Sequence, residues 1–135
     1  MVRLAYLDTS AALKLVVLEP GRDELLAHLS DPKLTLTASW LLYTEMLCAA
    51  GRRPEQLPEQ LARQALDQVE FVDLSRRDLT AAGRHAPLRS NDAIHLEVAL
   101  RLEVDELISY DRELITAAHR LGLSTASPGA QERIV

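Results

Sequence analysis

The chain has 135 residues, enough for one domain of ordinary size with its own hydrophobic core. Acidic residues outnumber basic ones by 20 to 15, so the net charge of −5 excludes a general attraction to nucleic acid, and any such contact must use a local basic patch. A lone cysteine, Cys48, short apolar runs such as Leu15–Leu18 and Trp40–Tyr43, and the absence of a secretory-signal pattern exclude an internal disulfide and a membrane span and predict a cytoplasmic protein.

Strand and helix patterns alternate along the whole chain. Up to position 50 we expect a strand at Arg3–Leu7, helices at Ala11–Leu18 and Asp23–Leu29, a strand at Leu34–Thr37 and a helix at about Ser39–Ala50. Beyond it we expect a helix at Glu59–Gln68, a strand at Val69–Leu74, helices at Leu79–His85 and about Asn91–Leu102, a strand at Glu106–Tyr110, a helix at Glu113–Leu121 and a strand at Leu123–Ala126. Thr9 or Ser10, Ser75 and Ser90 are the expected helix N-caps, and Pro128–Val135 is expected to be a loose tail.

Strands that alternate with helices, without tandem hairpins, are typical of a parallel sheet covered on both faces. The pattern therefore predicts an α/β fold of three layers, α/β/α, around a central parallel sheet of four to five strands. We interpret residues 1–135 as a single domain.

Two acidic residues stand alone in apolar stretches. Asp8 is the only charged residue between positions 3 and 14, and Glu45 is the only one between positions 33 and 52. Because an unpaired carboxylate in a protein core is costly, each needs a cation, strong hydrogen bonds or a shifted pKa. This isolation favours a functional site over a solvated surface.

Two further acids join them in the expected topology. Asp8 and Asp111 both follow strands, and Asp92 opens a helix three residues before His95. Because binding crevices form at the carboxyl ends of parallel strands, we expect the four carboxylates to meet there. An all-oxygen cluster favours magnesium or manganese, and a cation with open coordination positions can activate water for phosphodiester hydrolysis.

The motifs around these acids resemble those of the PIN-domain ribonucleases, particularly VapC-type toxins. The matching segments, in order, are Tyr6–Ala11 with Leu13–Leu15, then Glu45, then Asn91–Leu96, then Ser109–Asp111. The resemblance implies that the acidic metal-binding quartet consists of Asp8, Glu45, Asp92 and Asp111, and that Thr9 and Ser109 line its pocket. It also implies magnesium- or manganese-dependent cleavage of single-stranded or loop RNA, a homodimer, and inhibition by a cognate antitoxin.

Structural roles are open for each acid taken alone. Asp8 and Asp111 fit helix N-caps, and Asp92 fits a first-turn acid that interacts with the helix dipole. Glu45 fits a buried salt bridge to a distant arginine, such as Arg52 or Arg89. We leave His95 outside the catalytic set, as a packed core histidine, and interpret His28, His85 and His119 as surface residues.

Arginines flank the segments that carry two of the acids. Arg52, Arg53, Arg84 and Arg89 are candidates for contacts with RNA phosphates, with a solvated rim as the alternative. The few aromatic residues indicate no base-stacking platform, and Trp40 and Tyr43 fit core or dimer contacts. Two other functions remain open, namely a catalytically silent module for a basic partner and phosphoryl transfer through Asp8.

Overall fold

A computed structural model describes residues 2–130 of the chain. Its centre is a parallel sheet of five strands in the order β3-β2-β1-β4-β5. The strands are β1 (Arg3–Leu7), β2 (Leu34–Ser39), β3 (Glu70–Val72), β4 (Glu106–Ile108) and β5 (Thr125–Ala126). The order places β1 next to β4, although about a hundred residues separate them in the sequence, and this pairing brings the segments after both strands together.

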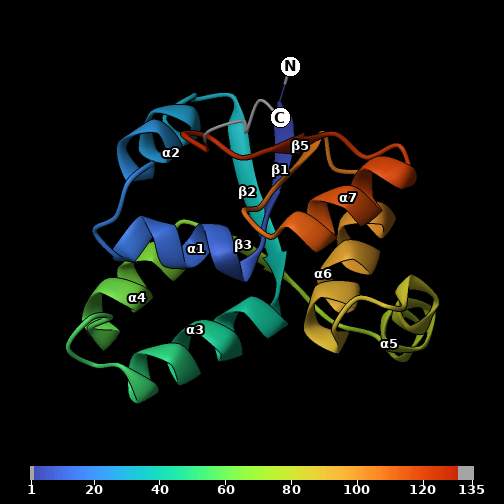
Figure 1. Cartoon of the computed structure of the whole chain (residues 1–135), viewed down its shortest axis with the longest axis horizontal. Helices are drawn as coiled ribbons and strands as arrows, with labels where there is room; N and C mark the ends of the chain where they lie inside the picture. The colour runs from blue at the N-terminus through green and yellow to red at the C-terminus, as the bar shows by residue number, and fades with distance from the viewer. Residues whose placement is uncertain (1, 131–135) are drawn as a thin grey trace.

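Helices cover both faces of this sheet, as Figure 1 shows. On one side lie α1 (Thr9–Val16), α2 (Arg22–Leu29), α3 (Trp40–Arg52) and α4 (Glu59–Leu66). On the other side lie α5 (Arg76–Ala82) with the short 3₁₀ helix η1 (Gly83–His85), α6 (Ser90–Arg101) and α7 (Arg112–Arg120). The predicted three-layer α/β/α arrangement with a parallel sheet is confirmed.

The two middle strands are apolar because both of their faces are covered. Tyr6 and Leu7 of β1 and Leu107 and Ile108 of β4 are at most 1% exposed. Burying a large aliphatic side chain of this kind contributes about 1.5–3 kcal/mol, so the central strands are held firmly. Their carboxyl ends are therefore a rigid support for the residues that follow.

Several element boundaries differ by a few residues from the sequence predictions, among them three in the elements next to the four acids. The N-cap of α1 is Asp8, and not Thr9 or Ser10, because its carboxylate accepts a hydrogen bond from the backbone N–H of Ala11. Helix α3 continues through Gly51, which was expected to follow its end. The strand expected from position 106 to 110 ends earlier, at Ile108.

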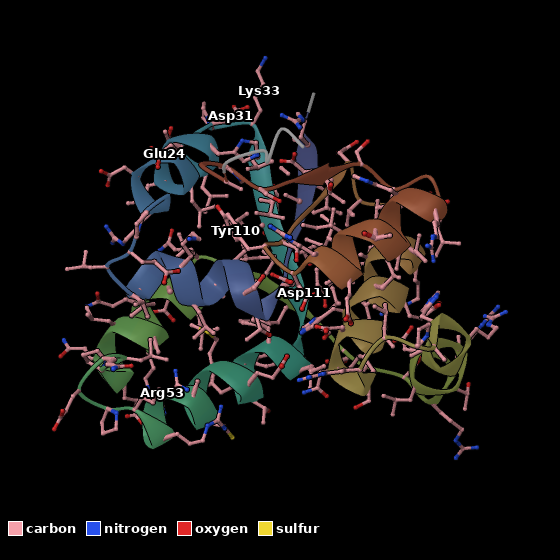
Figure 2. All side chains as sticks on the ribbon, viewed as in Figure 1. Glu24, Asp31, Lys33, Arg53, Tyr110 and Asp111 are labelled. Carbon is pink, nitrogen blue, oxygen red and sulfur yellow. The ribbon has the colours of Figure 1, made fainter. Side chains whose placement is uncertain are left out.

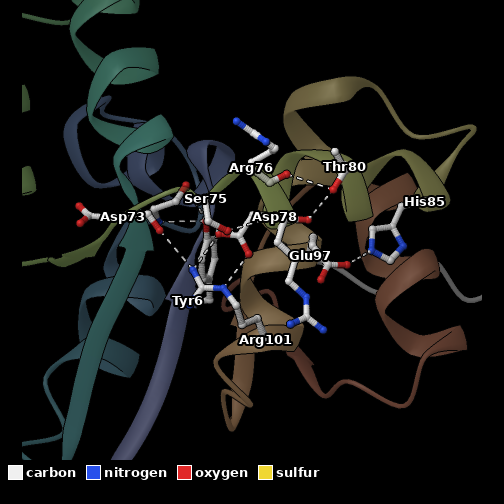
Figure 3. A network of polar contacts seen from close by, with 11 residues as sticks. Tyr6, Asp73, Ser75, Arg76, Asp78, Thr80, His85, Glu97 and Arg101 are labelled. Atoms are coloured by element: carbon white, nitrogen blue, oxygen red, sulfur yellow. Dashed lines mark hydrogen bonds and ion pairs between the residues drawn. The ribbon is translucent and has the colours of Figure 1, made fainter.

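A charged anchor fixes α5 against α6 (Figure 3). Asp78 is 1% exposed and accepts hydrogen bonds from Arg101 Nε at 2.7 Å and Nη2 at 3.0 Å. Ser75 forms a capping box with Asp78, so its predicted role as an N-cap is confirmed. His85, which was interpreted as a surface residue, instead pairs with Glu97 at 2.9 Å because α6 packs beside η1.

His28 is likewise not a free surface residue, because its Nε2 lies 2.8 Å from Glu106 Oε1.

Of the expected C-terminal tail, positions 128–130 are described and 131–135 lie outside the described residues. The Tyr110 hydroxyl donates a hydrogen bond to the carbonyl of Pro128. Within positions 2–130, every helix is too short or too polar to span a membrane.

Candidate acidic site

The carboxyl ends of β1 and β4 carry the first two acids of the site. Ser109, just beyond β4, connects them, because its hydroxyl donates to Asp8 Oδ2 at 2.6 Å and accepts from the backbone N–H of Asp111 at 3.0 Å. Asp111 also caps α7 by accepting from the N–H of Leu114. Figure 2 shows Asp111 near the middle of the molecule, at the start of α7.

Asp8 is almost completely enclosed, with 2% of its surface exposed. Its Oδ1 accepts from the Ala11 N–H at 2.9 Å and from the Ser10 hydroxyl at 2.7 Å, while Oδ2 accepts from Ser109. Burial raises the pKa of Asp8 above its ordinary value despite these hydrogen bonds. Asp8 is therefore the N-cap of α1, as considered from the sequence, and it also lies beside the other acids.

Glu45 lies at the centre of a hydrogen-bond network. Its Oε1 accepts from the Thr9 hydroxyl at 2.7 Å and lies 2.6 Å from His95 Nε2, while Oε2 accepts from Asn91 at 3.2 Å. Burial would raise the pKa of Glu45, but the contacts with His95, Thr9 and Asn91 outweigh it and lower the pKa. The salt bridge to Arg52 or Arg89, considered from the sequence, is wrong, because His95 occupies that place.

Behind Glu45, a buried chain of polar groups extends to the sheet. His95 is 1% exposed, and its Nδ1 lies 2.7 Å from the hydroxyl of Tyr6. That hydroxyl in turn accepts from the backbone N–H of Ser39 at the end of β2. The two ring nitrogens of His95 thus connect Glu45 on α3 to β1 and β2, which limits the positions that the glutamate can take.

Asp92 interacts electrostatically with all of the other three acids. The pKa of Asp92 is raised to about 6, first by burial and then by the charges of Asp111 and Asp8, with a smaller contribution from Glu45. These charges act on Asp92 only because the four carboxylates lie near one another. Among residues 2–130, none of the four forms an ion pair with arginine or lysine.

The family model of the PIN domain matches residues 5–120, which include all four acids. The chain belongs to the PIN domain family. It is 33% identical to a protein named Ribonuclease VapC47 from Mycobacterium tuberculosis, over 94% of this chain and 98% of that protein. It is 36% identical to Ribonuclease VapC46 of the same species, over 91% of this chain and 96% of the relative.

A solved structure also shares the fold of this PIN domain. A toxin–antitoxin complex from Klebsiella pneumoniae contains a chain that aligns with a TM-score of 0.63 and 21% identity, over 82% of this chain and 89% of that one. The sequence-based assignment to the PIN domain family is confirmed by the family match and by the two VapC relatives.

The donor chemistry of the PIN-domain site fits a hard divalent cation. All four acids offer carboxylate oxygens, the ligands that magnesium and manganese prefer, and their mutual repulsion favours a cation at this place. The side chains are not gathered as tightly as in a bound metal centre: within positions 2–130, no three His, Cys, Asp or Glu residues have the spacing of a ligand cluster. The acids are therefore neighbours without the geometry of a ligand cluster.

The four arginines chosen from the sequence occupy different places. Arg89, and not the expected Ser90, is the N-cap residue of α6, and Arg84 lies in η1. Arg52 and Arg53 lie at the far end of α3, and Figure 2 shows Arg53 well away from Asp111. The structure therefore brings these arginines to two separate regions and not to one patch.

Sequence reasoning missed the supporting residues of the site. Tyr6, Ser10 and Asn91 each contact an acid or His95, and His95 itself contacts Glu45. The sequence signal that could have indicated them is their closeness to the acids, because each stands within three positions of Asp8 or Asp92. Apart from the bond between Ser10 and Asp8, their contacts are long-range in sequence, so adjacency alone did not reveal them.

An aromatic cluster was also not expected from the sequence. Trp40 stacks on Phe71 with ring centroids 4.6 Å apart, and Tyr43 meets Phe71 edge-on at 5.9 Å. The cluster joins the start of α3 to the edge strand β3, and Trp40 remains 46% exposed.

Proposed function

We propose that this PIN domain is a metal-dependent endoribonuclease that hydrolyses RNA phosphodiester bonds by metal-activated water. The observation that carries the proposal is that the pairing of β1 with β4 brings Asp8 and Asp111 to one end of the sheet, while no arginine or lysine among residues 2–130 pairs with any of the four acids. Burial and then the charges of Asp111 and Asp8 beside it raise the pKa of Asp92. A polar site that accumulates charge of one sign without arginine or lysine partners is suited to a cation. The names of the VapC relatives support ribonuclease chemistry.

In this proposal Asp8, Asp92 and Asp111 hold a magnesium or manganese ion and Glu45 supports it. A cation bound there would lower the pKa of a water molecule and neutralise charge that develops on the phosphate. The chain's own residues fix the carboxylates: Thr9 and Asn91 donate to Glu45, and Ser109 donates to Asp8. Thr9 and Ser109 therefore line the site as hydrogen-bond donors that orient its acids.

We further propose that the protein acts as the toxin of a toxin–antitoxin pair, as a homodimer in the cytoplasm, on single-stranded or loop RNA. The likeness to a chain of a toxin–antitoxin complex supports an antitoxin partner. The alternative of a phosphoryl-accepting Asp8 lacks support, because Ser10 stands two positions after Asp8, where haloacid-dehalogenase-like phosphatases have a second aspartate.

The test is RNA cleavage by purified, antitoxin-free protein with magnesium, with manganese and with EDTA. We expect cleavage only with a divalent ion, and its loss in Asp92→Asn, a residue that caps no helix. Asp67→Asn is the matched control, because Asp67 is an exposed acid after α4, remote from the quartet in sequence. Cleavage in EDTA, or full activity of Asp92→Asn, contradicts the proposal, and no cleavage with either metal favours a silent binding module.

A further inference from the structure

A cavity of about 560 Å³ opens between α7 and the segment that joins η1 to α6. Much of its lining is apolar, contributed by Ala86, Pro87, Leu88, Ala117 and Leu121. Three arginines also line it: Arg84 from η1, and Arg112 and Arg120 from the two ends of α7. Figure 1 shows α7 beside α6, with α5 below them.

The charge of this cavity is opposite to that of the whole chain. All three arginines are exposed, and within positions 2–130 none of them forms an ion pair. Glu113 is the one acid among the lining residues. In a protein of net charge −5, three unpaired guanidinium groups around one apolar hollow form a local site for an anion with an apolar part.

The cavity begins beside the acidic site. Arg112 directly follows Asp111, and Arg120 is the last residue of α7, so the two backbone positions are about 12 Å apart along the helix. Helix α7 therefore carries arginines that line the cavity from the position next to Asp111 to its far end.

We propose that this cavity binds a nucleotide of single-stranded RNA next to the cleaved bond, an inference that rests on the proposed ribonuclease function. Arg112 and Arg120 contact backbone phosphates, and the guanidinium groups suit phosphate because they donate paired hydrogen bonds. The apolar wall formed by residues 86–88 and Ala117 receives the base or ribose. The arginines thereby offset the repulsion between the acidic site and the RNA backbone.

The test measures binding of a labelled single-stranded RNA of mixed sequence in EDTA, by fluorescence anisotropy over a range of salt concentrations. For the double variant Arg112→Ala with Arg120→Ala we expect RNA binding about tenfold weaker. The loss of each exposed arginine–phosphate pair should weaken binding by about threefold, and the two effects should multiply. The slope of log affinity against log salt should fall by about 1.4, or about 0.7 per phosphate contact. The double lysine variant should keep the slope.

The matched control is Arg76→Ala with Arg77→Ala, which removes two exposed charges from α5 outside the cavity and should change neither quantity. Unchanged affinity and slope in the Arg112 and Arg120 variant overturn the inference. A change in its oligomeric state by light scattering also overturns it, because the cavity then belongs to a protein contact. If the wild type binds RNA through these arginines but never cleaves it with magnesium or manganese, the ribonuclease proposal fails and the binding site stands.

Discussion

In the acidic site, burial and the neighbouring acids disfavour the charged form of Asp92. Its pKa is raised to about 6 by burial and by the charges of Asp111 and Asp8. A carboxyl group whose pKa is higher in the folded than in the unfolded protein stabilises the fold only while it is protonated. That contribution is present below the unfolded pKa, about 4, and is lost as the pH rises through about 6.

We therefore expect Asp92→Asn to be more stable than the wild type in metal-free buffer at neutral pH. The amide removes the like-charge repulsion, and the gain in unfolding free energy should be about 1 kcal/mol, allowing for solvent screening of a half-buried group. Urea unfolding in EDTA measures it. The difference between the two proteins should shrink as the pH falls below 6; a variant that is less stable at neutral pH would contradict the repulsion.

Which residues need partners could be predicted from the sequence, but not which partners they have. The isolation of Asp8 and Glu45 among apolar residues indicated that each required compensation. The compensation comes from Ser109 and His95, which are 101 and 50 positions away. Such pairings depend on strand order and helix packing, which local patterns do not encode.

At the scale of elements, Asp78 connects the start of α5 to the end of α6, the helix that carries Asp92. Burial would raise the pKa of Asp78, but hydrogen bonds from Arg101 and the Ser75 backbone outweigh it and lower the pKa. The stability that Asp78 contributes is thus present above the ordinary aspartate pKa and lost as the pH falls through its lower folded value.

We expect Asp78→Ala to lower the unfolding free energy by about 2 kcal/mol, because it removes one half of the capping box and leaves Arg101 without its carboxylate. Asp67→Ala, at an exposed position after α4, should stay within about 0.5 kcal/mol of the wild type. Chemical unfolding from neutral to acidic pH distinguishes the two. Equal stability of Asp78→Ala and wild type at neutral pH would show that the anchor contributes nothing.

Element types were more predictable than their ends. Apolar runs and helical periodicity indicated the strands and helices, whereas the first helix begins two residues earlier than expected because Asp8 is its cap. Asp8 was weighed both as a cap and as a site residue, and the structure gives it a cap's hydrogen bond beside the other acids. Because its carboxylate has two oxygens, Asp8 can cap the helix and also belong to the acidic site. The two interpretations therefore do not exclude each other.

At the scale of the whole molecule, the parallel sheet accounts for the gathering of the acids. The pairing of β1 with β4 brings Asp8 and Asp111 to one edge, and α3 and α6 add Glu45 and Asp92. Alternating strands and helices predict such an edge, so the neighbourhood of the site was predictable. The hydrogen-bond partners that fix each carboxylate were not predictable, because they come from distant segments, as the bond from Thr9 to Glu45 does.

Because the acids lie near one another, a bound cation should stabilise the fold. A cation that binds only the folded protein raises the unfolding free energy by about 2.7 kcal/mol at a hundred times its dissociation constant, so manganese should raise the melting temperature by several degrees. The shift should decline below pH 6, because the cation must then displace the proton of Asp92. It should be lost in Asp92→Asn and kept in Asp67→Asn. An equal shift in Asp92→Asn and wild type would mean that the cation binds elsewhere. A cation at the acidic site must interact with the charged form of Asp92, which the neighbouring acids disfavour.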